Sequence, residues 1–179
     1  MTDHWTPGDR RPDTASMLRV NQAGEYGATR IYAGQLAVLG RGTPASHLVA
    51  RMAAQEQRHL DRFNALMAER RVRPTLLQPL WNVAGFALGA ATALMSEQAA
   101  MACTEAVETE IERHYAEQLA ELGDTDPAFT ADIADFQAEE LEHRDTARAN
   151  GAADAAGYPL LTAVIRAGCR AAITLSKRI

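Results

Sequence analysis

Apolar residues recur at helical spacing along most of the chain. Between Val49 and Leu66, for example, they follow the i, i+3, i+4, i+7 pattern of an amphipathic helix. Capping residues such as Thr43-Pro44 and glycines such as Gly40 and Gly123 divide this pattern into segments. The pattern predicts an all-α protein, with helices over residues 14–39, 44–70, 97–122, 126–150 and 158–178.

A further segment, residues 74–96, carries no charged side chain. Its first part contains proline, glutamine and asparagine, so its apolar core is Leu80–Met95, which is shorter than the roughly twenty residues of a membrane span. We expect a hydrophobic helix that packs in a bundle and offers one side to lipid. Gly85 and Gly89 form a G-x-x-x-G motif, which can pack helices closely in membrane or in water.

The segment 158–178 mixes apolar residues with Arg166, Arg170, Lys177 and Arg178. Such a basic amphipathic helix can lie on an anionic lipid surface, or it can pack on the bundle with its arginines outward. Together with the uncharged segment before it, this helix favours contact with a membrane.

The length of 179 residues suits one domain, which we place at residues 14–179 behind a disordered tail of residues 1–13. The tail lacks the apolar run of a secretion signal. A net charge of −5 argues against nucleic acid as a partner. The two cysteines, Cys103 and Cys169, form no disulfide framework, so a reduced, cytosol-facing setting is expected.

The motif Glu-x-x-His occurs twice, at Glu56/His59 and at Glu140/His143. On a helix, residues three apart share a face, so each pair can bind one ion. A single such pair is most often a solvated surface pair. Glu56 and His59, however, fall within the apolar stripe of their helix, where an unpaired carboxylate would cost several kcal/mol. A bound cation would provide the missing partner.

Each pair is also preceded by a lone glutamate on another predicted helix. Glu25 lies 31 residues before Glu56, and Glu108 lies 32 residues before Glu140. Glu25 stands between Gly24 and Gly27, two glycines that cost about 2 kcal/mol in helix propensity relative to alanine. Either close helix packing or ions around Glu25 would compensate for that cost.

Other polar residues fit the pattern less well. Glu105, Glu112 and Glu121 are expected to be solvated, and Tyr26 to belong to the core. His114 is the main competitor as a metal ligand, but it has no glutamate three residues before it.

The ligand set is therefore Glu, Glu-x-x-His, Glu and Glu-x-x-His from four helices. This is the set of a dinuclear carboxylate site in a ferritin-like four-helix bundle. Here the uncharged and the basic helix would be additions for membrane contact. Carboxylates with one imidazole per ion suit iron or manganese, and spacing does not choose between the two.

Seven stretches of the chain closely resemble the demethoxyubiquinone hydroxylase family, the di-iron monooxygenases of ubiquinone biosynthesis. The resemblance extends over residues 14–179, and the stretches are Asn21–Ala28, Arg30–Gln35, Arg73–Thr75, Pro79–Val83, Gly85–Gly89, Met101–Thr104 and Glu139–His143. It implies two iron ions, which the six predicted ligands would hold. Glu25 and His59 would bind one iron, Glu108 and His143 the other, and Glu56 and Glu140 would bridge them.

The resemblance also implies a function, namely hydroxylation of the ring of 3-demethoxyubiquinol, a polyprenylated lipid, with dioxygen. Tyr115 and His114 match family positions near the irons and would assist electron or proton transfer. An electron donor, either NADH or a reductase, and other ubiquinone-biosynthesis proteins would be partners. The chain resembles a bacterial member, which implies a peripheral protein on the cytoplasmic side of the inner membrane.

Two rival functions stay open at this point. An iron-storage or peroxide-reducing protein of the same fold would have no need of residues 74–96. A metal-free lipid-binding scaffold of the ubiquinone pathway would have no need of a complete ligand set.

Overall fold

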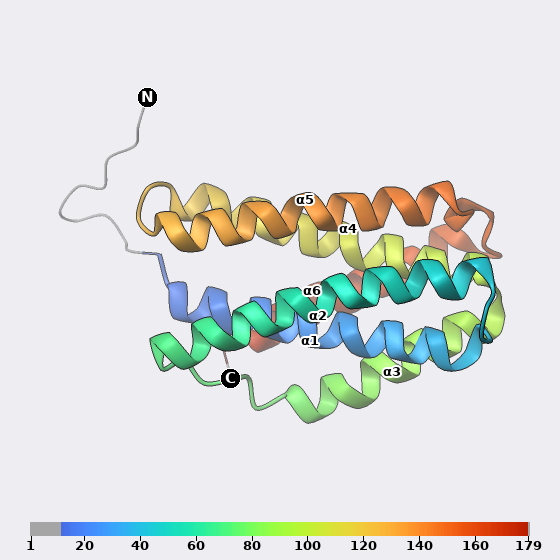
Figure 1. Ribbon diagram of the computed structural model, residues 1–179, viewed down its shortest axis with the longest axis horizontal. Helices are drawn as coiled ribbons and strands as arrows, with labels where there is room; N and C mark the ends of the chain where they lie inside the picture. Colours follow the sequence, from blue (N-terminus) through green and yellow to red (C-terminus); the bar gives the residue numbers. More distant parts are fainter. Residues whose placement is uncertain (1–11, 179) are drawn as a thin grey trace.

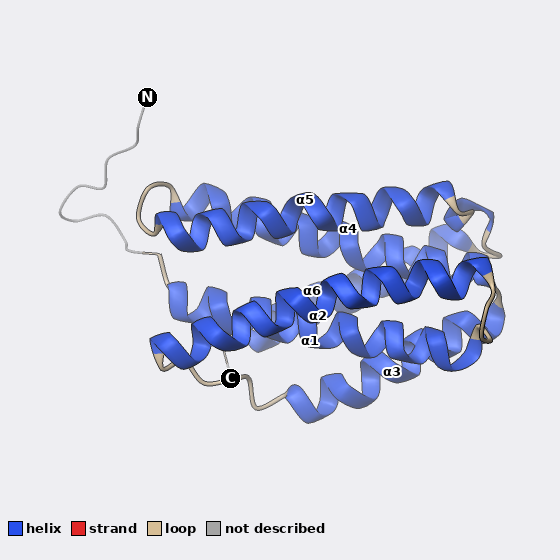
Figure 2. Ribbon diagram, in the orientation of Figure 1, coloured by secondary structure: helices blue, strands red, loops and turns tan. Residues whose placement is uncertain are grey.

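The computed structural model describes residues 12–178, which fold into a bundle of long helices (Figures 1 and 2). In order, its elements are α1 (Thr14–Val38), α2 (Pro44–Arg70), α3 (Gln78–Met95), α4 (Glu97–Leu122), α5 (Pro127–Ala149), the 3₁₀ helix η1 (Ala152–Asp154) and α6 (Tyr158–Ser176). No strand occurs among the described residues, so the all-α prediction is confirmed. Residues 1–11, most of the predicted tail, lie outside the described part of the chain.

The helices begin where side chains can cap them. Asp13, Thr43, Ser96 and Asp126 each accept a hydrogen bond from the backbone N–H three residues later. Proline then occupies the first turn of α2, α3, α5 and α6, where its missing N–H costs nothing. These local signals explain why the predicted boundaries differ from the observed ones by only a few residues.

Two antiparallel helix pairs, α1 with α2 and α4 with α5, make up the four-helix bundle. In Figure 1 the four helices run along the long axis of the molecule. The connection from α2 to α4 contains α3, which packs along α1, and α6 packs along α4. One long crossover of this kind is typical of a ferritin-like bundle.

The described residues form three apolar clusters, of which two contain residues from all four long helices. One contains Tyr32, Val49 and Met52 with a set of small residues from α4, and the other contains Phe63 and Phe129. On each of the four long helices, the predicted metal ligands lie between residues of the first cluster and residues of the second. The polar layer is therefore enclosed by apolar side chains on both sides along the bundle axis.

The G-x-x-x-G motif packs α3 directly against α1. A methyl carbon at Gly89 would lie 2.7 Å from the carbonyl carbon of Ile31 and would overlap its oxygen. A methyl carbon at Gly85 would lie 2.9 Å from the carbonyl oxygen of Gly27. The sequence left open what this motif packs against, and the structure identifies the partner as the backbone of α1.

Helix α6 is attached to α4 through charges that the sequence assigned to solvent or lipid. Arg166 and Arg170 each donate a hydrogen bond of 2.7 Å to Oε1 of Glu110, while Arg113 binds Oε2 at 2.8 Å. The Glu110 side chain is fully buried; burial alone would raise its pKa, but the arginines hold the pKa below its ordinary value. Both arginines of α6 are therefore occupied by a protein carboxylate, whereas Lys177 and Arg178 follow the end of the helix.

Glu105 was predicted to be solvated, and that prediction is wrong. Its side chain is buried and accepts a hydrogen bond of 2.7 Å from Arg148 of α5 and one from the hydroxyl of Tyr158, which lies 2.9 Å from both carboxylate oxygens. These contacts join α4 to the ends of α5 and α6. Tyr26, expected in the core, is only partly buried.

Among the described residues, no helix combines the length and the apolar character that crossing a membrane requires.

Candidate metal centre

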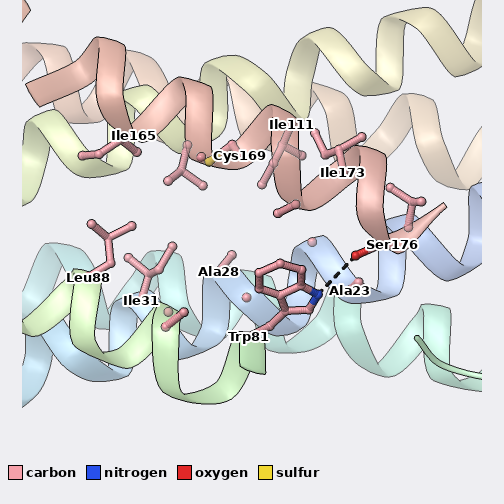
Figure 3. A pocket seen from close by; sticks show the side chains of 18 of the residues that line it. Ala23, Ala28, Ile31, Trp81, Leu88, Ile111, Ile165, Cys169, Ile173 and Ser176 are labelled. Atoms are coloured by element: carbon pink, nitrogen blue, oxygen red, sulfur yellow. Dashed lines mark hydrogen bonds between the residues drawn. The ribbon is translucent and has the colours of Figure 1, made fainter. Parts of the chain in front are cut away.

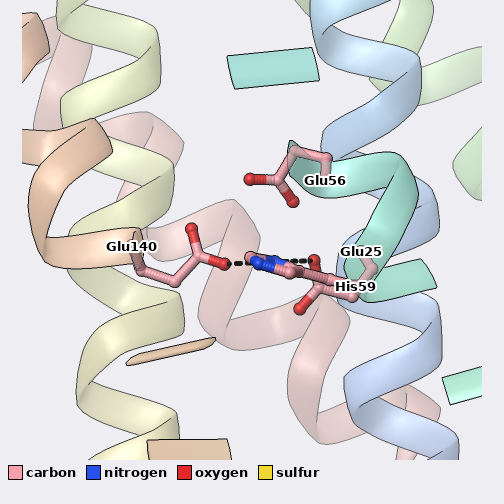
Figure 4. A group of neighbouring side chains, drawn as sticks. All are labelled: Glu25, Glu56, His59 and Glu140. Atoms are coloured by element: carbon pink, nitrogen blue, oxygen red, sulfur yellow. Dashed lines mark ion pairs between the residues drawn. The ribbon is translucent and has the colours of Figure 1, made fainter. Parts of the chain in front are cut away.

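Six buried carboxylate and imidazole side chains meet in the middle of the bundle. Each of the four long helices contributes to them, and the side chains are those of Glu25, Glu56, His59, Glu108, Glu140 and His143. They form two groups that share Glu56 and Glu140, and within each group one ligand atom per residue lies within 4.8 Å of the others. Figure 4 shows the first group, which adds Glu25 and His59 to the shared pair.

The two groups have matching geometry. The Nδ1 atom of His59 lies 3.4 Å from Oε2 of Glu25 and 3.1 Å from Oε1 of Glu140. The Nδ1 atom of His143 lies 3.0 Å from Oε1 of Glu56 and 3.3 Å from Oε2 of Glu140. Glu140 thus offers one oxygen to each group, which is the arrangement of a bridging carboxylate.

The inward-facing atoms of the cluster lack hydrogen-bond partners. This holds for both oxygens of Glu56 and Glu140, for one oxygen each of Glu25 and Glu108, and for Nδ1 of both histidines. Buried polar atoms are nearly always satisfied, and each exception costs free energy. Metal ions at the centre of each group would satisfy these atoms, so the residues present fit a pair of metal ions.

The pKa values of the buried glutamates also favour bound metal ions. Burial raises the pKa of Glu56 and of Glu108 well above the ordinary value, and the neighbouring charge of Glu140 raises both further. Burial also raises the pKa of Glu140. Without a cation these carboxyl groups retain protons that exposed glutamates would lose. A divalent ion would replace those protons, so its binding is expected to release them.

Two tyrosines hold Glu25 and Glu108 in place, the outer glutamates that belong to only one group each. The hydroxyl of Tyr32 donates a hydrogen bond of 2.6 Å to Oε1 of Glu108, and the hydroxyl of Tyr115 donates to Oε1 of Glu25. Tyr32 lies seven residues after Glu25, and Tyr115 lies seven residues after Glu108. Tyr32 was not among the predicted site residues, although it occupies the same position in the repeat as Tyr115, seven residues after a glutamate.

His114 lies outside both groups. Its ring is buried, with Nε2 2.8 Å from the side-chain nitrogen of Gln118, which also bonds to Asn21. Burial, together with the charges of Lys177 and Arg113, lowers the pKa of His114 to about 4, so the ring is neutral near pH 7. The competitor ligand named from the sequence therefore does not reach the cluster.

An apolar pocket of about 340 Å³ lies beside the cluster, between α1, α3, α4 and α6 (Figure 3). Val107 lines it next to Glu108, and Gly24 lines it next to Glu25. A methyl group at Gly24 or Gly27 would meet no atom within 4 Å. The missing side chains of these glycines leave open space in the pocket wall, so close helix packing does not explain Gly24.

The fold and the donor set together define the class of ferritin-like carboxylate bundles, in which two glutamates and two Glu-x-x-His motifs can hold two metal ions. A family model described as ubiquinone biosynthesis protein COQ7 matches residues 12–176. The chain belongs to this family, as its resemblance predicted.

Individual relatives are similar over most of the chain. The 3-demethoxyubiquinol 3-hydroxylase of Rhodospirillum rubrum is 54% identical over 97% of this chain and 82% of its own length. The NADPH-dependent 3-demethoxyubiquinone 3-hydroxylase of Mus musculus is 54% identical over 90% of this chain, and that of Homo sapiens is 52% identical over 91%. The matched region covers 76% of each of these two mitochondrial relatives.

Proposed function

We propose that this protein is a di-iron monooxygenase that hydroxylates the ring of 3-demethoxyubiquinol in ubiquinone biosynthesis. The observation that carries the proposal is a buried cluster of six unsatisfied ligand residues beside an apolar pocket, in a member of this family. An iron-storage protein requires the cluster but not the pocket. A metal-free scaffold requires the pocket but not the cluster.

The six residues would divide between the ions as the two groups divide. Glu25 and His59 would bind one iron, Glu108 and His143 the other, and the shared Glu56 and Glu140 would bridge both. Four carboxylates offset the charge of two ferrous ions. Oxygen-rich ligation with one imidazole per ion suits iron, and family membership favours iron over manganese.

Iron bound here would supply the activation of dioxygen, and the protein would supply the surroundings. The hydroxyls of Tyr32 and Tyr115 hold Glu108 and Glu25 in place, so these carboxylates keep one oxygen free to bind metal. The apolar clusters on both sides of the polar layer exclude water. We also propose that Tyr115 and His114 assist the transfer of electrons or protons from a donor, either NADH or a reductase.

The pocket would hold the quinol ring and the start of its prenyl tail. It is lined by apolar and small residues, and its walls on α1 and α4 include the neighbours of Glu25 and Glu108. A ring in this position would lie close to the cluster, and the tail would leave between α3 and α6.

Filling the pocket should impair the reaction without removing iron. A Gly24→Leu variant would place its side chain in the open space of the wall, so we expect the KM for demethoxyubiquinol to rise about tenfold or more. Ala37→Leu on the exposed face of the same helix is the matched control and should leave KM unchanged. Kinetics with bound iron measured in parallel would check this. A Gly24→Leu enzyme with normal KM and normal iron would contradict the assignment of the pocket.

The helices α3 and α6, which line this pocket, also carry exposed apolar residues, and these support contact with a membrane. They lie on α3, on α6 and just before α3, and they include Leu76, Leu80, Val83, Leu94, Met95, Leu160, Val164 and Leu175. We propose that this face rests on the cytoplasmic side of the inner membrane, where the lipid substrate is dissolved. Other ubiquinone-biosynthesis proteins would then act on the same membrane.

Removing apolar side chains from α3 should weaken binding to lipid. Leu80, Val83 and Leu94 contribute about 1.5 kcal/mol each if they are buried in lipid, so changing all three to glutamine should lower vesicle binding by about 1,000-fold. The control changes the exposed Ala54, Ala120 and Ala131 to glutamine. Sedimentation with neutral and anionic vesicles would measure the effect. Unchanged binding of the α3 variant would mean that this helix does not meet lipid.

The function itself is tested by iron content and by the quinone pool. Protein purified with iron should hold about two irons per chain, because each group of ligands completes one position and both groups share their bridges. Expressed in cells that lack their own hydroxylase, the chain should convert demethoxyubiquinone to the hydroxylated quinone. A well-folded chain that binds iron but leaves the quinone pool unchanged would favour storage, and one that binds no iron would favour the scaffold.

A further inference from the structure

The residue immediately before each bridging glutamate contacts the histidine of the opposite helix. Glu139 precedes Glu140 on α5, and its Oε2 lies 3.0 Å from Nε2 of His59 on α2. Gln55 precedes Glu56 on α2, and its Oε1 lies 3.1 Å from Nε2 of His143 on α5. The two contacts correspond to each other in the repeat, but one acceptor is a carboxylate and the other is an amide.

These two residues also bond to each other. The side-chain nitrogen of Gln55 donates a hydrogen bond of 3.2 Å to Oε2 of Glu139, so the amide oxygen of Gln55 is the atom that accepts from His143. Both rings must then carry their proton on Nε2. Nδ1 of each ring faces the carboxylates, where it has no hydrogen-bond partner, and it would be left without a proton once metal is bound. This is the orientation that a metal ion requires of an imidazole.

The inner donors of the two groups are matched. Each group has one outer glutamate bonded to a tyrosine, one histidine, and the same two shared glutamates. The two groups differ in the residue that accepts a hydrogen bond from Nε2 of the histidine. This acceptor is a charged carboxylate at His59 and a neutral amide at His143. A carboxylate acceptor makes an imidazole a stronger electron donor than an amide acceptor does.

We infer that Gln55 and Glu139 form one hydrogen-bonded unit that orients both histidines, and that it makes the metal position at His59 bind more tightly than the position at His143. The inference rests on the proposed metal site. It assigns positioning roles to two residues that lie outside the ligand set.

Arg58 opposes this difference only in part. It donates hydrogen bonds of 3.2 and 3.0 Å to the two oxygens of Glu139, but its side chain is 62% exposed. Water and salt screen its charge, whereas the bond between Glu139 and the buried His59 ring is direct. The carboxylate therefore still distinguishes the two metal positions.

The test is an anaerobic titration of the metal-free protein with Co²⁺, followed by absorption and calorimetry. Wild-type protein should bind two ions in two steps that differ by about 10- to 100-fold in affinity. His59→Ala and His143→Ala variants identify the steps, since His59→Ala should remove the tighter one. Gln55→Leu should weaken the second step only, while Glu139→Gln should weaken the first by about 10- to 100-fold. Glu142→Gln, on the exposed face of α5, is the control and should change neither step.

The decisive variant exchanges the two residues. Gln55→Glu combined with Glu139→Gln keeps the total charge and moves the carboxylate to His143, so the order of the two affinities should reverse. An unchanged order, or two equal steps in the wild-type protein, would overturn the inference. Equal steps in a protein that still hydroxylates its quinol would leave the proposed function intact. Distinct steps without hydroxylation would remove the proposed function and keep the inference.

Discussion

Changing Glu140 to glutamine should abolish hydroxylation and deplete iron, whereas changing Glu142 to glutamine should leave most activity. Glu140 is fully buried and faces both groups of ligands, while Glu142 is exposed on the same helix. Residues two apart on a helix point about 200° away from each other, so only Glu140 shares a face with His143. A neutral amide does not replace an anion that offsets two ferrous ions, so we expect a loss of about 100-fold or more.

This pair of variants separates ligation from general electrostatics. Both changes remove one negative charge from α5, so a general effect of charge would touch both alike. The assay is conversion of demethoxyubiquinone in cells without their own enzyme, with iron measured on the purified protein. If Glu142→Gln is the inactive, iron-poor variant, the ligand assignment is wrong by about half a turn of the helix.

Gly89→Ala should destabilise the protein by about 3 kcal/mol, because overpacked cores relax only at that kind of cost. The added methyl group would overlap the carbonyl oxygen of Ile31, which is backbone and does not move aside. Helix α3 would separate from α1, and the wall of the pocket would separate with it. Chemical denaturation and thermal unfolding of the iron-loaded protein would measure the change.

Gly24→Ala is the matched control, since it adds the same methyl group to a glycine that has no atom within 4 Å of the new carbon. Alanine favours a helix over glycine by about 1 kcal/mol, so this variant should be as stable as the wild type or more stable. Gly89→Ala and Gly24→Ala should thus change stability in opposite directions. A Gly89→Ala variant of normal stability would show that α3 does not pack on α1 through this contact.

The local sequence pattern sufficed to predict the helices and the spacing of the candidate ligands. A helix is determined by residues within a few positions of each other, so the apolar period and caps such as Thr43 and Asp126 place its ends. The same period places Glu140 and His143 on one face. All six predicted ligands meet in the structure for this reason, together with the repeat that supplies each of them from a long helix.

That pattern did not predict the contacts between helices. The positions of Glu105 and Glu110 along their helix do not distinguish them from solvated glutamates. Only the packing of α5 and α6 brings arginines to them. Tyr32 is near Glu25 in sequence but bonds to Glu108 on another helix.

The sequence by itself therefore determined the helices and the types and register of the candidate ligands, because each depends on neighbours along one helix. Only the tertiary structure decided the fate of chemically identical residues. Gly24 opens on a pocket whereas Gly89 touches backbone, and His59 bonds to a carboxylate whereas His143 bonds to an amide. These differences depend on which atoms a second helix brings within a few ångströms, and one-dimensional spacing does not contain that information.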